Sequence, residues 1–210
     1  MQTVHLAKYK LGLTLNQTQS SVLVGSILGD GTLRIGKDAI NANFKVEHSL
    51  KQKDYVFWKY DLFKEWVTTP PKLSFRYNEN RIPYSKSWWF RTIRHPKLTL
   101  FHKLFYRDGI KIVPKKIMNL LDPLALAVWI MDDGSLNGNK IDLSTYSFKL
   151  EEIKLLQTVF LAKFALKSSF YKDRDKGLRM YFSKQETQKF IPLISPFIIP
   201  SLAYKVPLTP

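Results

Sequence analysis

The sequence predicts an α+β protein built from two tandem copies of a helix–strand–strand–helix–strand–strand–helix repeat. Two observations support this prediction. First, residues 23–31 (LVGSILGDG) and residues 126–134 (LAVWIMDDG) are both apolar runs that end in Asp-Gly, and Asp133 follows Asp30 by 103 positions in a chain of 210 residues. Second, the same order of helical and strand-like hydrophobic patterns follows each run.

Each Asp-Gly segment has the features of a helix with a defined start and stop. The polar residues 16–21 precede the first segment, and Asp122-Pro123 precedes the second. Polar residues of this kind cap helix N-termini, and proline is favoured at the first helical position. Both helices then run into glycine, which commonly terminates a helix.

An alternating pattern follows each of these helices. In residues 41–48, and again in residues 140–146, the side chains that can face a core alternate with polar side chains. Period-two alternation with one polar face is typical of a sheet that is exposed on one side. We therefore expect each repeat to present a polar sheet surface to its surroundings.

The later elements recur in the same order. Helices with one apolar face are expected at residues 55–66 and 150–160. Strand pairs are expected at residues 72–77 with 88–94, and at residues 167–174 with 178–183 around a turn at 175–177. A helix closes each half, at residues 97–106 and 184–194. The predicted organisation is a first repeat at residues 1–106, a connecting linker at 107–121 and a second repeat at 122–210.

The composition favours a polyanionic partner. Lys and Arg number 33 against 17 Asp and Glu, which gives a formal net charge of +16. Such an excess favours nucleic acid first and a membrane surface second. The absence of cysteine excludes disulfides, thiolate metal sites and cysteine nucleophiles. No apolar run approaches the roughly 20 residues of a membrane-spanning helix, so we expect a soluble protein with no membrane partner.

The paired aspartates are the main candidates for chemistry. Aspartate is unfavourable at a helix C-terminus because that end carries partial negative charge. Gly25 and Ala127 are small enough to let the two helices pack closely through a central interface, which would bring Asp30 and Asp133 together. Two such carboxylates need a divalent cation, and Mg²⁺ suits oxygen ligands of this type. A cation held there beside a phosphodiester can activate water.

Neighbouring residues have weaker claims. A single Asp-Gly after an apolar run is usually only a helix stop, whereas two in register within a repeat favour a site. Asp132 has no counterpart in the first half, where Gly29 stands, and we expect it to offer its backbone carbonyl or a structural hydrogen bond. Lys111 and Lys205 lie in two similar Lys-to-Pro segments and would add positive charge near the transition state.

These motifs resemble the LAGLIDADG homing endonucleases, specifically the single-chain, two-repeat type encoded in fungal mitochondrial introns. The resemblance rests on both Asp-Gly segments, on LALAVWIMDDGS, on IKIVPKKI and on FIIPSLAYKVP, and it extends from about Thr18 to Pro207. It implies a monomeric, mitochondrial, site-specific endonuclease. Such an enzyme lays two saddle-shaped antiparallel sheets in the major groove of a long asymmetric double-stranded DNA site, and cuts across the minor groove to leave 3′ overhangs.

The resemblance also assigns roles to residues of this chain. It places metal ligation on the carboxylates of Asp30 and Asp133 and on the main chain of Gly29 and Asp132. It places the basic catalytic groups on Lys111 and Lys205. The implied cofactor is Mg²⁺, with Mn²⁺ or Ca²⁺ able to occupy the same sites.

One departure from the motif lies in the second copy. Val128 stands where the motif has glycine, with Trp129 beside it, and this substitution would loosen or reshape the helix packing there.

The polar strand faces are the candidates for DNA contact, because a two-stranded ribbon fits the major groove. The candidates for base or phosphate contacts are Asn41, Asn43, Lys45, Glu47, Lys72, Ser74, Arg76, Arg91, Lys140, Ser144, Lys172 and Arg179. The choice of face is best supported at residues 41–47 and weakest at 167–183.

Two alternatives stay open at this point. One is an intron maturase that uses the same basic surface on intron RNA and needs no carboxylates. The other is a non-catalytic DNA-binding regulator, against which the matched lysines argue. Retention of both Asp30 and Asp133 favours the nuclease.

Overall fold

The computed structural model describes residue 9 and residues 12–207. The chain forms two compact units. The first contains the chain up to Ser20 together with Gly31–Lys103, and the second contains Ser21–Asp30 together with Leu104–Pro210. The division falls inside the first Asp-Gly helix. Most of that helix therefore belongs to the same unit as the second Asp-Gly helix.

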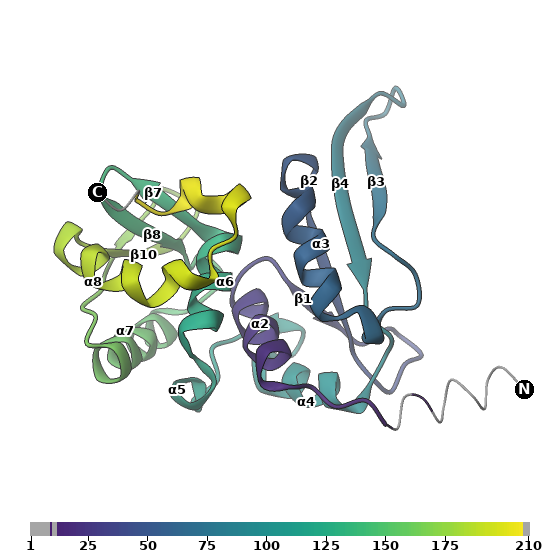
Figure 1. Ribbon diagram of the computed structural model, residues 1–210, viewed down its shortest axis with the longest axis horizontal. Helices are drawn as coiled ribbons and strands as arrows, with labels where there is room; N and C mark the ends of the chain where they lie inside the picture. The colour runs from purple at the N-terminus through teal and green to yellow at the C-terminus, as the bar shows by residue number, and fades with distance from the viewer. Residues whose placement is uncertain (1–8, 10–11, 208–210) are drawn as a thin grey trace, which may run out of the picture. The chain divides into compact units, whose positions relative to one another are not determined.

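The element order confirms the α+β fold class and the predicted repeat (Figure 1). The first repeat consists of α2 (Gln17–Leu28), β1 (Thr32–Arg34), β2 (Asn43–Ser49), α3 (Lys53–Leu62), β3 (Lys72–Tyr77), β4 (Pro83–Arg91) and α4 (Pro96–Phe105). The second consists of α6 (Pro123–Asp133), β7 (Gly134–Asn137), β8 (Lys140–Ser144), α7 (Leu150–Phe164), β9 (Ser169–Lys172), β10 (Leu178–Phe182) and α8 (Lys184–Ile194).

Shorter elements lie between and around the repeats. The expected linker contains β5 (Tyr106–Arg107), β6 (Ile110–Lys111) and α5 (Ile117–Leu120). The 3₁₀ segments are η1 (Leu50–Gln52), η2 (Lys64–Trp66), η3 (Ser195–Phe197) and η4 (Pro200–Lys205). No helix in the described part of the chain is both long enough and apolar enough to span a bilayer.

The first unit is a four-stranded antiparallel sheet with one covered face. Its strand order is β1-β2-β4-β3, and α3 packs on one face of it (Figure 1). Phe44, Val46 and His48 point into the core, as the alternation predicts. The predicted helix at 55–66 ends instead at Leu62. Trp66 reaches the core from η2.

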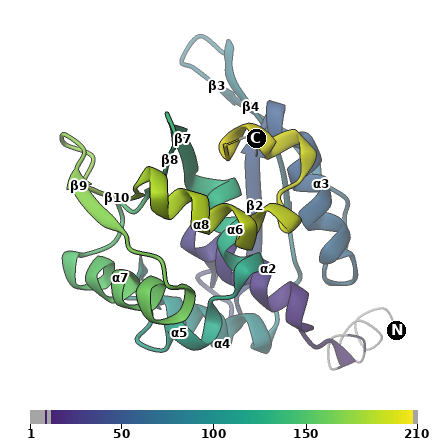
Figure 2. The ribbon, with the colours of Figure 1, turned by 60° about the vertical axis from the view of Figure 1, so that its left-hand side comes forward.

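The second unit repeats the same topology. Its sheet has the order β7-β8-β10-β9. Figure 2 shows helices α7 and α8 of this unit together with its strands. Aromatic side chains of α7, α8 and β10 form a cluster, in which the ring of Phe160 lies 4.9 Å from that of Phe182 and 5.9 Å from that of Phe190. The apolar face predicted for residues 150–160 is buried except at Leu150, which stays exposed.

Sequence patterns located most strands well and some incompletely. Strand β3 has the predicted bounds, whereas β4 begins at Pro83, five residues before the predicted start. Strand β2 begins at Asn43, so Asn41 lies outside it. Strands β1 and β7 are only three and four residues long. An alternation over so few residues is too short to locate a strand from the sequence.

Both Asp-Gly helices begin as predicted. The Asn16 Oδ1 atom accepts a hydrogen bond from the main-chain N–H of Gln19 at 2.8 Å. In the reverse direction, the Gln19 Oε1 atom accepts one from the main-chain N–H of Asn16 at 3.1 Å. The Asp122 carboxylate accepts the Ala125 N–H at 2.8 Å, with proline at the start of α6. These side chains satisfy N–H groups that a helix leaves without partners at its first turn.

The two Asp-Gly helices pack against each other through a glycine. A Cβ atom added at Gly25 would lie 2.3 Å from the Ala125 carbonyl oxygen and 2.7 Å from the Val128 Cβ. Gly25 thus allows the close helix packing expected from the sequence, and the atoms nearest to it belong to Ala125 and Val128. Val128 replaces the motif glycine without opening a gap, since Gly25 leaves room for it.

We predict that Gly25→Ala destabilises the protein. Alanine favours a helix over glycine by about 1 kcal/mol, but the new methyl group would collide with a main-chain carbonyl that cannot rotate away. We expect a net loss of ~1–3 kcal/mol in the free energy of unfolding, the usual cost of overpacking. Urea denaturation measures it. Gly12→Ala is the control, because an added Cβ there meets no atom within 4 Å from the described residues outside its own local backbone. Equal stability of the two variants would contradict the close helix contact.

Candidate functional site

The C-terminal ends of α2 and α6 meet within the second unit. Gly25 contacts Ala125 and Val128, and Gly29 contacts Asp132, so the contacts advance together along both helices and the helices run in the same direction. Asp30 follows α2, and Asp133 is the last residue of α6. Asp30 is exposed and Asp133 is half-buried. The expected meeting of the two Asp-Gly ends is thus a feature of a single compact unit.

Two lysines bind the carbonyl groups at these helix ends. The Lys111 Nζ donates to the Gly29 carbonyl oxygen at 2.7 Å. The Lys205 Nζ donates to the carbonyl oxygens of Met131 at 2.6 Å and Asp132 at 2.8 Å. Lys111, from the linker, thus caps the end of the first Asp-Gly segment, and Lys205 caps the second, where an ammonium group offsets the negative end of the helix dipole.

Asp132 makes a structural hydrogen bond, one of the two roles expected for it. Its side chain is only 5% exposed, and its Oδ2 atom accepts the main-chain N–H of Asp30 at 3.2 Å. Gly29 provides the space, because a Cβ atom at that position would lie 2.4 Å from the Asp132 Cβ. The two Asp-Gly motifs thus differ at this position because Gly29 of the first leaves the space that the Asp132 side chain of the second occupies.

The electrostatics of the site disfavour its carboxylate charges. Burial raises the pKa of Asp133 to about 7, and the negative charges of Asp30 and Asp132 add to the rise, while Lys111 and Lys205 oppose it. Burial also lowers the pKa of Lys111, against the attraction of the same three carboxylates. Three carboxylates thus share the site with two ammonium groups, which leaves a local negative excess in a chain of net charge +16.

The donor set fits a hard divalent cation. Carboxylate and carbonyl oxygens are the ligands that such ions prefer. A bound cation would stabilise the ionised form of Asp133 against the burial and the repulsion that raise its pKa. Among the described residues, no group of three or more His, Cys, Asp and Glu side chains forms a ready-made cage. The candidate donors are therefore two carboxylates, Asp30 and Asp133, and the main-chain carbonyls of Gly29 and Asp132, each of which has a second lone pair beside its lysine.

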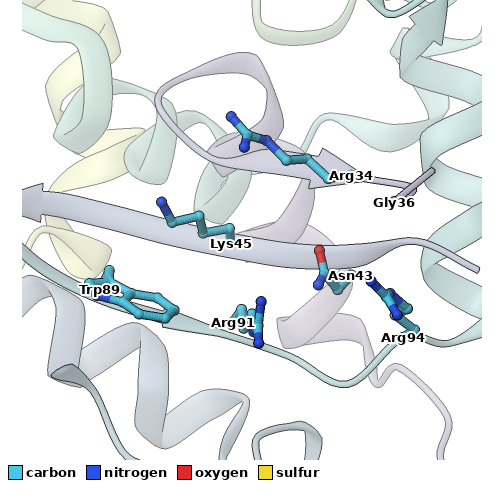
Figure 3. A pocket seen from close by; sticks show the side chains of 7 residues that line it. All are labelled: Arg34, Gly36, Asn43, Lys45, Trp89, Arg91 and Arg94. Atoms are coloured by element: carbon cyan, nitrogen blue, oxygen red, sulfur yellow. The ribbon is translucent and has the colours of Figure 1, made fainter. Parts of the chain in front are cut away.

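The first unit presents a strongly cationic cavity on its polar sheet face. The cavity has a volume of about 280 Å³ and draws side chains from β1, β2 and β4 (Figure 3). Its lining consists of Arg34, Gly36, Asn43, Lys45, Trp89, Arg91 and Arg94. Strand register explains the grouping, because Lys45 lies opposite Arg91 and Asn43 lies opposite Arg34. The Lys45 ammonium sits 5.5 Å from the centre of the Trp89 ring.

Glu47 lies on the same polar face. It accepts hydrogen bonds from Lys45 at 2.5 Å and Ser87 at 2.7 Å, and Arg76 approaches it at 3.7 Å. Burial opposes its ionisation, but these partners outweigh burial and hold the pKa of Glu47 below its ordinary value. Glu47 therefore orients two cations on a surface that is otherwise positive.

In the second sheet, Arg179, one of the predicted DNA-contact residues, forms hydrogen bonds within the protein. The Arg179 guanidinium donates to the Tyr146 hydroxyl at 3.0 Å and to the Ser135 hydroxyl at 2.5 Å. It also lies 3.6 Å from the carboxylate of Asp142, which is 4% exposed. The alternation predicts an outward-facing Asp142, and this network explains why it is buried. Lys140 and Ser144 share this sheet face, as predicted.

Two other predicted contact residues lie elsewhere. The Asn41 side chain accepts a hydrogen bond from Thr99 on α4 at 3.0 Å, and so does not belong to the strand face. Lys172 pairs with Leu178 in the register, on the face of Phe170 and Met180 rather than the face of Arg179. The other candidates on β3, Lys72, Ser74 and Arg76, share the polar face with Ser87 and Trp89.

Sequence reasoning missed four residues of the cationic cavity: Arg34, Gly36, Trp89 and Arg94. The signal for Arg34 was a buried Leu33 followed by an exposed arginine, which is too short to stand out. Trp89 is an aromatic residue, a type that hydrophobic patterns assign to a core rather than to a cationic cavity. Arg94 lies beyond the end of β4, where alternation no longer applies.

Comparison with known proteins agrees with this geometry. Residues 20–190 match the model of the LAGLIDADG DNA endonuclease family. The chain therefore belongs to that family. DNA endonuclease I-ChuI of Chlamydomonas applanata is 29% identical, over 92% of this chain and 96% of the relative. Cytochrome b mRNA maturase bI2 of Debaryomyces hansenii is 30% identical, over 91% and 74%. The structure of the homing endonuclease I-WcaI bound to its DNA recognition sequence has a TM-score of 0.89 at 27% identity, over 97% of this chain and 92% of that one.

We predict that Asp133 makes the metal-free protein less stable as pH rises. Its pKa in the folded protein is about 7, against an ordinary value of 3.8, so the folded state holds this proton more tightly than the unfolded chain does. The resulting stability is fully present below about pH 4 and is lost as pH rises through about 7.

Urea denaturation of metal-free protein at about pH 5 and about pH 7.5 measures this effect. Wild type should lose more stability between the two pH values than Asp133→Asn, which has no proton to release. Asp175→Asn, at an exposed turn between β9 and β10, should keep the wild-type dependence. If wild type and Asp133→Asn responded identically to pH, the assignment would be wrong.

Proposed function

We propose that this protein is an intron-encoded, site-specific endonuclease of double-stranded DNA that hydrolyses phosphodiester bonds with Mg²⁺ and leaves 3′ overhangs. The observation that carries the proposal is the pair of Asp-Gly helix ends at which Asp30, Asp133 and two capping lysines converge. Membership of the LAGLIDADG DNA endonuclease family supports the same conclusion.

The chain's own residues divide the work at the site. Asp30 and Asp133 would hold the metal, with main-chain carbonyls of Gly29 and Asp132 as further donors. A bound divalent cation supplies an activated water and charge stabilisation of the leaving oxygen. Lys111 and Lys205 fix the carbonyls and add positive charge close to the phosphate. Their bonds to the main chain keep these ammonium groups in place before substrate arrives.

The polar sheet faces would read the DNA. The first sheet offers Asn43, Lys45, Arg91 and the arginines Arg34 and Arg94 around one cavity. A β-ribbon fits the major groove, where arginine and asparagine side chains distinguish base pairs by paired hydrogen bonds. Contacts to phosphates would supply most of the affinity, and contacts to base edges most of the specificity.

An RNA-binding maturase function is the second candidate. A maturase of Debaryomyces hansenii is among the relatives, at 30% identity. The same basic surface suits either nucleic acid, whereas RNA binding alone has no need of the paired aspartates. The nuclease is therefore the primary proposal. We further propose that the protein acts as a monomer in the mitochondrion, as its two-repeat chain and its intron-encoded relatives suggest.

The decisive experiment is cleavage of a duplex that carries the exon junction created by loss of the intron. We predict metal-dependent double-strand cleavage by wild type, and none with a chelator. Asp30→Asn and Asp133→Asn should each slow cleavage by more than about 100-fold, the upper cost of losing a residue that merely orients a metal ligand. Both variants should still bind the duplex in a gel-shift assay, because the basic contacts remain.

Asp175→Asn serves as the matched carboxylate control and should cut at the wild-type rate. Full cleavage by Asp30→Asn or Asp133→Asn would refute the roles assigned to these residues. Tight binding of intron RNA by a wild-type protein that cuts no DNA would instead support the maturase.

We predict that the cationic cavity contributes phosphate or base contacts. Arg34→Ala or Arg91→Ala should weaken binding, and each lost phosphate contact should reduce the slope of log affinity against log salt by about 1. A lost base contact would instead relax specificity by ~1–3 kcal/mol at one position. Lys64→Ala is the control, an exposed cation on η2 away from the polar sheet face. If both the salt dependence of the affinity and the base specificity stayed at their wild-type values, the cavity would not be part of the DNA interface.

A further inference from the structure

We infer that Asp132 is a positioning residue that fixes the main chain at Asp30, and that the two halves of the metal site are consequently supported by different means. The inference rests on the proposed nuclease function. It assigns to the Asp132 side chain a role separate from metal ligation, and it explains why the two Asp-Gly motifs differ at the preceding residue.

The evidence lies in one peptide group, the bond between Gly29 and Asp30. Its carbonyl oxygen accepts from the Lys111 Nζ at 2.7 Å, and its N–H donates to the Asp132 Oδ2 at 3.2 Å. Both ends of this peptide are therefore held by side chains from distant parts of the sequence. Because a peptide is planar, holding its oxygen and its N–H sets the direction in which the chain enters Asp30.

The second repeat reaches the same result without such a clamp. Helix α6 continues through Asp133, so the main chain there is held by the helical hydrogen-bond ladder. Helix α2 ends at Leu28, two residues before Asp30. The carboxylate of Asp132 thus supplies, from α6, an acceptor to a peptide that lies beyond the last residue of α2.

Gly29 and Asp132 fit each other as a pair. A Cβ atom at Gly29 would lie 2.4 Å from the Asp132 Cβ and 2.9 Å from its Oδ2. The Asp132 side chain is 5% exposed, so it is held against the helix end rather than free to turn to solvent. Gly29 in the first motif and Asp132 in the second therefore depend on each other, because the aspartate side chain occupies the space that the glycine leaves open.

The consequence is that losing the Asp132 acceptor should disturb Asp30 and spare Asp133. Each aspartate belongs to a different repeat, and the two repeats have sheets of the same topology, so we assign each repeat to the cleavage of one DNA strand. A loosened Asp30 should therefore slow one strand more than the other and let nicked duplex accumulate. General destabilisation of the fold would slow both strands together.

Two substitutions separate the hydrogen bond from the charge. Asp132→Asn keeps an acceptor oxygen of the same shape and removes the charge, whereas Asp132→Ala removes both. In metal-free protein, amide hydrogen exchange followed by NMR should be faster at Asp30 in Asp132→Ala than in wild type, and near wild type in Asp132→Asn. In cleavage assays with each strand labelled, Asp132→Ala should slow one strand relative to the other by about 10–100-fold, the usual cost of losing a group that orients a metal ligand. Asp132→Asn also removes a charge beside Asp133, so the quantity compared is the ratio of its two strand rates, which should stay near that of wild type.

Glu186→Ala is the matched control. Glu186 is also a buried carboxylate of the second unit, 8% exposed, and accepts a main-chain N–H, that of Lys167, at 2.8 Å. It should leave the exchange at Asp30 and the ratio of strand rates unchanged.

Several results would overturn the inference. An equal change in the ratio of strand rates in Asp132→Asn and Asp132→Ala would show that charge, not the hydrogen bond, matters. Equal loss on both strands, or unchanged exchange at Asp30, would remove the positioning role. A wild-type protein that cuts neither strand would refute the proposed function instead, and the exchange comparison would still decide whether Asp132 holds the Gly29–Asp30 peptide.

Discussion

The close approach of α2 and α6 is the contact on which the candidate site depends. Gly25 and Gly29 lie four residues apart, on one face of the first Asp-Gly segment, and each faces the second helix without a Cβ atom. Any side chain at Gly25 would separate the helix from the Ala125 carbonyl, and any side chain at Gly29 would displace Asp132. The helix ends, and the aspartates that they carry, are brought together because Gly25 and Gly29 have no side chains.

Bringing the helix ends together places carboxylates close to one another, and two lysines reduce the resulting repulsion. Burial, together with the repulsion among carboxylates gathered at two negative helix ends, raises the pKa of Asp133 to about 7, so Asp133 retains a proton to near neutral pH. Lys111 and Lys205 bind the helix-end carbonyls, and their charges offset part of the repulsion. The remaining negative excess is local, and a divalent cation would neutralise it. A strongly basic protein can thus hold one acidic spot for a metal while the rest of its surface attracts a polyanion.

The two sheets share a topology and use their polar faces differently. In the first, Lys45, Arg91 and neighbouring arginines surround an open cavity. In the second, the guanidinium of Arg179 donates hydrogen bonds to Tyr146 and Ser135 and lies 3.6 Å from the Asp142 carboxylate, so it is already engaged within the protein. The two halves of the molecule would consequently offer different chemistry to a target. An asymmetric recognition site is what such a chain would select, and a duplicated sequence pattern alone does not reveal that asymmetry.

The sequence by itself determined the repeat, the order of the elements, both helix starts and the candidacy of Asp30 and Asp133. These features are local, because caps, hydrophobic periods and glycine stops act over a few neighbouring residues. The tertiary structure decided what local patterns do not contain: that Gly25 faces Ala125, that the Asp132 carboxylate reaches the Asp30 N–H, and that Arg179 is committed within its own sheet. The first two contacts join residues about a hundred positions apart, and helix rotation rather than composition sets which atoms meet. The commitment of Arg179 likewise follows from strand register and from the reach of a long side chain.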